Sequence, residues 1–433
     1  MRKKKVLFYG TPDTLKKFLA DAVNHEFEIV ALLNDNLQNF FSRLEVFTPQ
    51  TLPQFAYEIV DGIILADNAK SSANFFLFKG IEPRKIILYD TEKGWLPHNM
   101  TETDGTKVTY FGGLEFHIRN PADEKFFQGI QGELRIQRAH RNLNPSEYGK
   151  LVAQDFQRKR KRPLDFNNLQ TFTEKLNWLK VFDATPLKGR LADKYAVRSW
   201  VAEKIGDEYL IPLLGAWDDF DDINFEDLPN QFVLKCSHSW NTNIIVRDKS
   251  KFDKQNARER INAWLRVDHG ILGFELHYSY SYIRRKIIAE KFMTNGDLPD
   301  LSNYRFWCFD GKPIYCGLDN DFINPGRMDY FYMDWKPTEF ENAFLPHSEH
   351  PEEIPPPKNF ELMKKLAAKL AADFAFVRVD FYEIEGKVYM GEMTFTPGSA
   401  HFYYKNEKAD EYLGSLVKLP VASAPPPRYN FAA

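Results

Sequence analysis

The sequence predicts an α/β N-terminal domain with a parallel, Rossmann-like sheet, followed by a larger α+β region. Two observations carry this prediction. Over residues 3–91 short apolar runs alternate with helical segments, whereas from about residue 168 onward strands form hairpins between helices. A length of 433 residues suits two or three domains, and the 43% hydrophobic and 27% charged residues are typical of a globular protein.

The N-terminal region contains four short apolar runs that predict strands. Because parallel strands need crossover connections, helical segments at 14–24 and 37–44 favour a parallel sheet. The first run ends in the turn Gly10–Thr14, which could bind an anion at a helix N-terminus or simply cap that helix. The turn holds one glycine and so lacks a dinucleotide-binding fingerprint. The expected strands are 5–10, 28–33, 62–66 and 85–89.

Residues 92–165 are polar and basic, and we expect them to be irregular apart from a helix over 144–158. The domain junction is placed at Arg162-Pro163. The basic run 158–162 is either a contact for acidic lipid or a polyanion or, as is usual for such runs, a solvated linker. Further on, the expected helices are 169–182, 194–205, 254–264 and 359–372, and the expected strands are 232–236, 244–247, 286–290, 304–309 and 313–318.

Composition narrows the classes of function. The formal net charge of −3 provides no basic field for nucleic acid. Cys236, Cys308 and Cys316 are too few for a disulfide framework and lack metal-ligand spacing, which fits a reducing compartment. No stretch approaches the length of a membrane span, and the basic start precedes too short an apolar run for a signal peptide. We therefore expect a cytoplasmic protein.

A hairpin near the C-terminus is the most informative feature. Alternating runs at 376–382 and 387–393 predict two paired strands. Two carboxylates beside a guanidinium suit a magnesium ion that carries phosphate oxygens. The other interpretation is an ordinary hairpin with a solvated charged face. The polar face in question carries Arg378, Asp380, Glu392 and Thr394.

Two lysines and a strand end extend this candidate anion site. Lys235 ends a buried strand, where its charge is costly unless an anion meets it. Lys194 is expected in the first turn of a helix capped by Asp193, where a cation is unfavourable without an anionic ligand. The strand Lys286–Met293 leaves into a polar turn and suits an adenine, and His238 could serve as a base or ligand. Taken singly, each of these residues is more often structural.

Several stretches of the second half occur in a fixed order: F-T-E-K-L-N-W-L-K-V-F-D (172–183), D-K-Y-A-V-R (193–198), K-I-G-D-E-Y-L-I-P-L-L-G (204–215), L-P-N-Q-F-V-L-K-C-S-H (228–238), N-I-I-V-R-D-K-S-K (243–251), F-V-R-V-D-F-Y (376–382) and G-E-M-T-F-T-P-G-S (391–399). Together they resemble the TupA-like branch of the ATP-grasp superfamily, which is found in bacterial surface-polysaccharide gene clusters. The order and spacing hold from about residue 168 to residue 415.

The resemblance implies an α+β ATP-grasp fold with an ATP cleft between two subdomains. The expected division is a Rossmann-like domain at 1–120, a linker region at 121–167, an ATP-grasp domain at 168–420 and a tail at 421–433. The implied roles are triphosphate binding by Lys194 and Lys235; adenine binding by Glu290, Lys291 and Met293; ribose binding by Asp297 or Asp300; magnesium binding by Asp380, Glu392 and Thr394; and catalysis by Arg378, Lys235 and His238.

The implied function is an ATP- and Mg²⁺-dependent carboxylate–amine ligase that forms an amide through an acyl phosphate on a sugar of capsule or O-antigen polysaccharide. Its partners would be a small-molecule or sugar-linked carboxylate, an amine or amino acid, and a nucleotide sugar at the N-terminal domain. Two alternatives stay open, a glycosyltransferase of polysaccharide synthesis and a non-catalytic nucleotide-binding module.

The chain departs from the family pattern at two places. Thr394 stands where many ATP-grasp ligases have a metal-binding asparagine, although threonine is common in the TupA-like branch. Loop 239–243 contains no glycine, whereas the branch usually has a glycine-rich loop there. Glycines let backbone amides close over phosphates.

Overall fold

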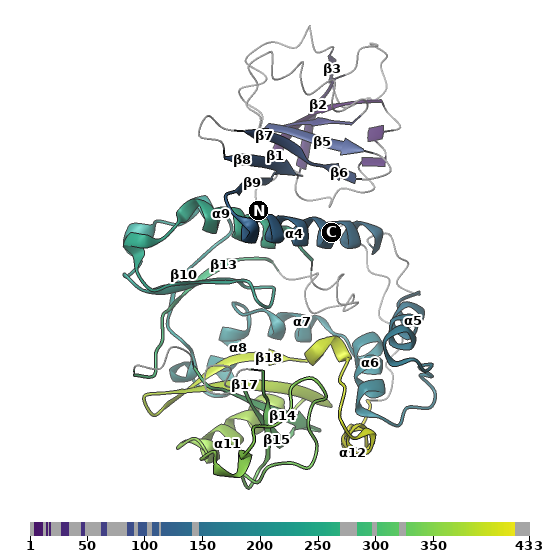
Figure 1. Cartoon of the computed structure of the whole chain (residues 1–433), viewed down its shortest axis with the longest axis vertical. Coiled ribbons are helices and arrows are strands. Elements are labelled where there is room, and N and C mark those ends of the chain that lie inside the picture. The colour runs from purple at the N-terminus through teal and green to yellow at the C-terminus, as the bar shows by residue number, and fades with distance from the viewer. Residues whose placement is uncertain are drawn as a thin grey trace. The chain divides into compact units, whose positions relative to one another are not determined.

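The structure of the chain is a computed structural model, and Figure 1 shows the order of its elements. The chain divides into two compact units. Unit 1 comprises Met1–Asn142, Asp253–Val267 and Asn430–Ala433, and unit 2 comprises Leu143–Phe252 and Asp268–Tyr429. The domain limits expected from the sequence stay a prediction. The structure describes residues 4–11, 14–15, 17–18, 27–33, 45–47, 62–66, 85–90, 94–101, 106–111, 114–140, 147–268, 284–296, 301–319 and 326–420.

A six-stranded sheet with the order β3-β2-β1-β4-β5-β6 forms the core of unit 1. Neighbouring strands from β3 to β5 pair in parallel, and β6 pairs antiparallel with β5. Residues 6–8 and 63–65 are buried consecutively, as expected of parallel strands covered on both faces. The four predicted strands are confirmed. The bounds are β1 Lys4–Tyr9, β2 Phe27–Leu33, β3 Glu45–Phe47, β4 Gly62–Leu65, β5 Ile86–Asp90 and β6 Gly94–Leu96.

The helices expected at 14–24 and 37–44 lie largely or wholly outside the described residues. The crossover connections that would define a Rossmann-like domain are therefore not described, and that assignment stays a prediction.

The prediction that residues 92–165 are irregular is wrong for most of the segment. In unit 1 it forms an antiparallel sheet of the order β7-β8-β9 and the 20-residue helix α4. The sequence signal is weak because the buried apolar residues of α4, among them Phe127 and Ile130, are diluted by charged residues. The bounds are β7 His98–Thr101, β8 Lys107–Phe111, β9 Leu114–Ile118, α4 Pro121–His140 and α9 Lys254–Arg266, the last close to its prediction.

Unit 2 contains two antiparallel sheets, with the orders β10-β13-β11-β12 and β16-β15-β14-β17-β18. The strands predicted in this region are confirmed to within two residues, whereas β10 and β16 are not among the predicted strands. The bounds are β10 Leu213–Trp217, β11 Phe232–Cys236, β12 Asn243–Val246, β13 Ile287–Lys291, β14 Asn303–Phe309, β15 Lys312–Asp319, β16 Asp329–Tyr332, β17 Phe376–Ile384 and β18 Lys387–Thr394.

The helices of unit 2 match the predicted pattern, with one correction and two additions. Helix α8 begins at Val197 rather than at Lys194, because Asp193 Oδ1 accepts hydrogen bonds from the backbone N–H groups of Tyr195 and Ala196 in a preceding turn. Helices α7 and α12 are not among the predicted helices. Among the described helices, none is long and apolar enough to cross a membrane. The bounds are α5 Tyr148–Arg160, α6 Phe172–Phe182, α7 Pro186–Ala192, α8 Val197–Lys204, α11 Phe360–Ala371 and α12 Glu407–Leu416.

The five-stranded sheet is buried on both faces, since successive residues of β14 pack into different cores. Phe306 and Cys308 pack with residues of α8 and α11. Trp307 and Phe309 pack with residues of α6 and α12. The sheet is consequently a rigid platform whose central strands cannot shift register without moving both cores.

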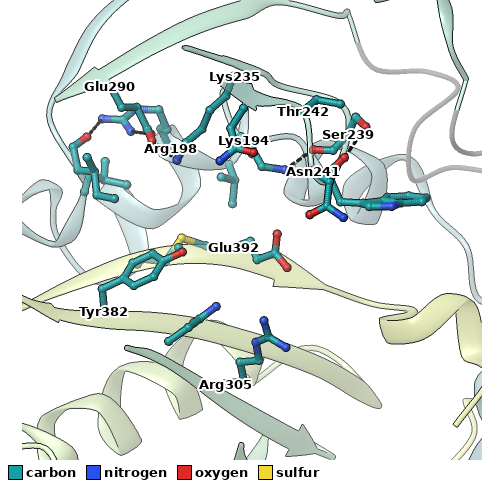
Figure 2. A pocket seen from close by; sticks show the side chains of 18 of the residues that line it. Lys194, Arg198, Lys235, Ser239, Asn241, Thr242, Glu290, Arg305, Tyr382 and Glu392 are labelled. Carbon is teal, nitrogen blue, oxygen red and sulfur yellow. Dashed lines mark hydrogen bonds and ion pairs between the residues drawn. The ribbon is translucent and has the colours of Figure 1, made fainter. Parts of the chain in front are cut away.

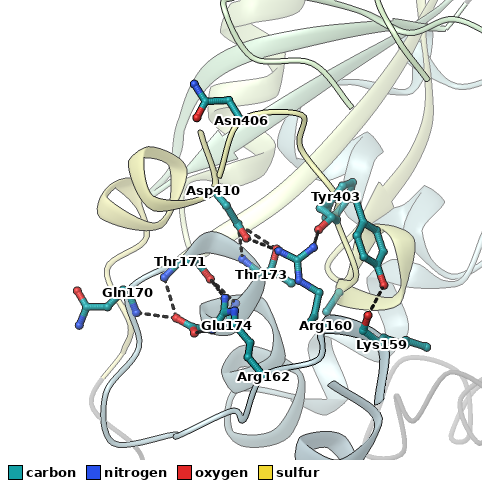
Figure 3. A network of polar contacts seen from close by, with 12 residues as sticks. Lys159, Arg160, Arg162, Gln170, Thr171, Thr173, Glu174, Tyr403, Asn406 and Asp410 are labelled. Atoms are coloured by element: carbon teal, nitrogen blue, oxygen red, sulfur yellow. Dashed lines mark hydrogen bonds and ion pairs between the residues drawn. The ribbon is translucent and has the colours of Figure 1, made fainter. Parts of the chain in front are cut away.

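A buried polar network joins α5, α6 and α12 (Figure 3). Asp410 accepts hydrogen bonds from the backbone N–H and the Oγ1 of Thr173, both at 2.9 Å, and from Arg160 Nη2 at 3.2 Å. Arg162 pairs with Glu174, whose carboxylate also completes the N-terminal cap of α6. The Arg160 side chain is only 11% exposed, so the interpretation of the basic run as a solvated linker is wrong at this position.

Replacing Asp410 by alanine would leave Arg160 and the donors of Thr173 buried without their acceptor. We expect Asp410→Ala to lower the free energy of unfolding by about 3 kcal/mol, because an uncompensated buried charge is costly. Urea unfolding of the full chain measures this change.

Asp373→Ala is the matched control, since its carboxylate is 61% exposed and pairs with Lys204 at 3.6 Å. It should change the free energy of unfolding by less than about 0.5 kcal/mol. Equal effects of the two substitutions would contradict a structural role for the network.

Candidate functional site

A cavity of about 340 Å³ lies within unit 2, and we call it the cationic cavity (Figure 2). Side chains from β11, β13 and the 239–243 loop line one side, and side chains from β14, β17 and β18 line the other. Its size falls within the usual range for small-molecule sites. Five cations outnumber two carboxylates among its described lining residues, which favours an anion of several charges. The charged residues are Lys194, Arg198, Lys235, Arg305, Arg378, Glu290 and Glu392.

The predicted C-terminal hairpin is confirmed. Strands β17 and β18 pair antiparallel, with Arg378 opposite Thr394 and Asp380 opposite Glu392. Their turn, Glu385-Gly386, has φ values of 50° and 76°, as a tight two-residue hairpin turn requires.

A β-bulge at Gly391 sets this pairing. Asp380 lies opposite Glu392 whereas the next residue, Phe381, lies opposite Met390, so Gly391 is the extra residue. A Cβ atom at Gly391 would lie 2.9 Å from a tyrosine ring and 3.3 Å from the backbone oxygen of Asp380. Because a shift of one residue reverses the side-chain faces, the bulge is what aligns Glu392 with Asp380.

Arg378 bridges the two carboxylates of the hairpin. Its Nε and Nη2 each lie 2.7 Å from an oxygen of Asp380, and Nη2 lies 2.5 Å from Glu392 Oε1. Asp380 is buried and does not line the cavity, whereas Glu392 does (Figure 2). Burial by itself would raise the pKa of Glu392, but the charges of Arg378 and Lys194 lower this pKa to about 2. Glu392 is therefore ionised at neutral pH.

The carboxylates fit part of a magnesium site. Within the described part of the chain, no group of three or more His, Cys, Asp or Glu side chains is arranged to hold a metal. Mg²⁺ is usually bound by one or two carboxylates together with substrate phosphates. Glu392 with Asp380 behind it fits that pattern, and Thr394 Oγ1 donates to Glu392 at 2.9 Å. Magnesium binding by Asp380, Glu392 and Thr394 stays a prediction.

Lys235 and Glu290 form an ion pair between neighbouring strands, with Nζ and Oε2 2.6 Å apart (Figure 2). The other oxygen of Glu290 lies 3.3 Å from Arg198 Nη1. Glu290 thus holds two cations at the cavity wall. Its predicted contact with adenine is not tested by this arrangement.

Lys194 is fixed at the cavity by its backbone and by its ammonium group. Its backbone N–H donates to the Ser237 carbonyl at 2.9 Å, and its Nζ donates to the Ser239 carbonyl at 2.5 Å. Asp193 accepts from Ser237 Oγ at 2.6 Å, which fastens the turn to the end of β11. Burial lowers the pKa of Lys194 more than nearby Glu392 raises it.

The loop after β11 turns without glycine. Asn241 has a φ of 54°, in the left-handed region that asparagine tolerates better than most residues. Residues 239–243 all line the cationic cavity, and Trp240 is partly exposed there. The glycine-free sequence is therefore compatible with a tight loop beside the cavity.

Other predicted site residues lie away from the cavity lining. His238 is fully buried, and Lys291 and Met293 follow or end β13 without lining the cavity. Asp297 and its alternative, Asp300, lie outside the described residues. The roles predicted for these residues stay predictions.

Sequence reasoning missed Arg198, Arg305 and Tyr382, which all line the cavity. Arg198 follows Lys194 by four residues, so helical spacing could have indicated it. Arg305 lies opposite Asp380 in the pairing of β14 with β17, a long-range contact that no local pattern reveals.

The cationic cavity is lined from two antiparallel sheets, one of which supplies an arginine with a facing carboxylate. The family match places the chain in the ATP-grasp class of ATP-dependent ligases. Residues 174–418 match the model of the family described as TupA-like ATPgrasp, and the chain belongs to that family. This match confirms the resemblance and the prediction of an ATP-grasp ligase. No curated protein is significantly similar in sequence.

Solved structures of ATP-grasp ligases are similar to parts or most of the chain. D-Alanine-D-alanine ligase from Helicobacter pylori is 18% identical with a TM-score of 0.27, over 53% of this chain and 61% of that ligase. D-Alanine–D-alanine ligase from Bacillus anthracis is 12% identical with a TM-score of 0.29, over 92% and 88%. The RiPP-associated ATP-grasp ligase from Chryseobacterium gregarium is 11% identical with a TM-score of 0.29, over 98% and 99%. Family membership rests on the sequence match.

The lowered pKa of Lys194 predicts a pH-dependent affinity for anionic nucleotide. The ammonium loses its proton at a lower pH than an ordinary lysine, so the affinity for the Mg²⁺ complex of AMP-PNP should fall as the pH rises from about 7 toward about 10. Lys194→Arg carries a cation that does not titrate in this range, so its affinity should stay nearly constant. Isothermal titration calorimetry across the pH range measures both.

Lys364→Arg is the control for the change of residue type, because Lys364 pairs with Glu361 on α11 and does not line the cavity. It should keep the wild-type pH profile. The same decline in Lys194→Arg as in the wild type would exclude Lys194 as the titrating group.

Proposed function

We propose that the protein is an ATP- and Mg²⁺-dependent carboxylate–amine ligase that forms an amide through an acyl phosphate. The observation that carries this proposal is the pair of Arg378 and ionised Glu392 at the wall of the cationic cavity. Phosphoryl transfer to a carboxylate brings two anions together, and fixed cations reduce their repulsion.

The first step is the activation of the acid. A carboxylate oxygen of the substrate attacks the γ-phosphorus of ATP, the bond to the bridging oxygen breaks, and ADP leaves. Lys194 and Lys235 hold the phosphates in this proposal, and Arg378 faces the transferred group. Magnesium, when bound, neutralises charge on the phosphate oxygens, with Asp380 and Glu392 as its carboxylates.

The second step forms the amide. The amine attacks the acyl carbon, a C–N bond forms, the C–O bond to phosphate breaks, and the nitrogen gives up a proton. We assign Thr394 to the metal shell through its hydrogen bond to Glu392. His238 does not line the cavity, so in this proposal His238 acts by positioning the loop 239–243 that follows it.

The substrates and the N-terminal domain belong to the same proposal. Adenine lies at the exit of β13 near Glu290, Lys291 and Met293, with Asp297 as the ribose partner. The carboxylate belongs to a sugar of capsule or O-antigen polysaccharide, and the partner is an amine or amino acid.

The N-terminal domain is Rossmann-like and binds a nucleotide sugar, which its parallel strand order supports. We place the protein in the cytoplasm, where its three free thiols would stay reduced.

The two alternatives receive less support. A glycosyltransferase would need acidic residues available to a sugar nucleotide, and the acidic run D-D-F-D-D at 218–222 is the candidate segment. Its first residue, Asp218, pairs with Arg284 at 2.6 Å and with Lys286 at 3.1 Å. The glycine-free loop 239–243 is the observation that favours a non-catalytic module, yet Asn241 supplies a left-handed turn there. We therefore retain the ligase as the proposed function.

Glu392→Gln should abolish most turnover while preserving the shape of the side chain. With Mg-ATP, hydroxylamine and a panel of uronic and amino acids, the wild type should form hydroxamate and ADP together. We expect Glu392→Gln to slow both by at least about 100-fold, because it removes a charge from the reacting region.

Glu361→Gln on the exposed face of α11 is the matched control and should keep the wild-type rate. Full activity of Glu392→Gln would exclude the proposed role of this carboxylate. Failure of the wild type to bind AMP-PNP would contradict the ligase itself.

A further inference from the structure

A second cavity of about 230 Å³ lies within unit 2, and we call it the aromatic cavity. Arg305 and Arg378 line both this cavity and the cationic cavity. The two spaces are therefore neighbours that share a wall of guanidinium groups. The rest of the lining is rich in rings: Trp307, Tyr330, Phe344, Phe402 and Tyr403.

The shared guanidinium groups are held in place from behind. Arg378 makes its two 2.7 Å contacts with Asp380, and Arg305 pairs with Asp319. Arg305 Nε also lies 3.9 Å from Asp380. An acid that extends from the aromatic cavity can therefore place its carboxylate against both arginines, on the side that faces the cationic cavity.

The rings form a prearranged surface rather than a loose cluster. The rings of Trp307 and Phe402 lie 4.9 Å apart at 71°, in an edge-to-face arrangement. Phe344 and Tyr403 lie 5.2 Å apart at 68°. Rings held in this way bind a flat or cyclic group at little cost in side-chain entropy.

Phe344 is the strongest single indication of a ligand. It is 72% exposed, although it borders a cavity lined by other rings. Asn342 Oδ1 accepts from the backbone N–H of Phe344 at 2.8 Å and of Leu345 at 3.2 Å, so the loop is braced to present this ring. An exposed aromatic ring on a braced loop is typical of a binding surface.

We propose that the aromatic cavity binds the body of the carboxylate substrate, a ring-bearing carboxylic acid, with its carboxylate on Arg305 and Arg378 and its ring against Phe344. This inference rests on the proposed ligase function. The shared chemistry is a ring with apolar faces and a carboxylate, which a sugar acid and an aromatic acid both offer.

Equilibrium binding to the full chain tests the proposal, with and without Mg²⁺ and AMP-PNP. The probes are D-glucuronate, benzoate, acetate and the uncharged ring D-glucose. At least one of the two ring-bearing acids should bind about tenfold more tightly than acetate, and D-glucuronate more tightly than D-glucose. Whichever of D-glucuronate and benzoate binds with the higher affinity identifies the ring as that of a sugar acid or of an aromatic acid.

Phe344→Ala should weaken binding of the stronger ring-bearing acid by about tenfold and leave acetate and AMP-PNP binding unchanged. Tyr412→Ala removes another exposed ring, 46% exposed on α12 and outside both cavities, and should change none of these affinities. Acetate binding as tightly as both ring-bearing acids, or an unchanged affinity in Phe344→Ala, would overturn the inference. If the protein binds a ring-bearing acid but not AMP-PNP, the proposed ligase function is contradicted and the inference about the aromatic cavity stands. The titrations without nucleotide measure binding in the aromatic cavity independently.

Discussion

The site depends on one guanidinium group that two carboxylates of the same hairpin contact. Asp380 binds Arg378 through two parallel hydrogen bonds, and this bidentate contact fixes the plane of the guanidinium. Glu392 binds the same group from the facing strand. Buried charges are tolerable only when each has a partner. The fixed orientation of Arg378 is therefore a condition for holding the carboxylates of Asp380 and Glu392 side by side.

Two backbone features make that contact possible. The bulge at Gly391 aligns the carboxylates, and the two-sided burial of the five-stranded sheet prevents β17 from sliding. Phe376 packs into the core that contains α6, and Arg378 and Asp380 follow it at alternate positions on the same face of β17. One strand face thus passes from an apolar core to a polar site within a few residues.

The parts of the site that sequence reasoning found are the local ones. Side-chain alternation in the runs 376–382 and 387–393 was enough to place Arg378, Asp380 and Glu392 together, because the two strands are adjacent in sequence. Arg305 was missed since its pairing with Asp380 joins strands that are distant along the chain. The bulge was missed although glycine within a strand is a known sign of one. Helix α4 was missed because charged residues dilute its narrow apolar face. Lys194 was wrongly predicted to lie in a helix, because the turn that holds it depends on a hydrogen bond to Ser237, which is distant in the sequence.

The wall that Arg305 and Arg378 contribute to both cavities has a thermodynamic consequence. An anion bound on one side changes the electrostatic potential that an anion on the other side meets. Cooperativity of this kind must be reciprocal: the factor by which nucleotide alters the affinity for acid equals the factor by which acid alters the affinity for nucleotide. A positive coupling would show that the two arginines stabilise both bound anions together. A negative coupling would show that the two anions compete for the same arginines.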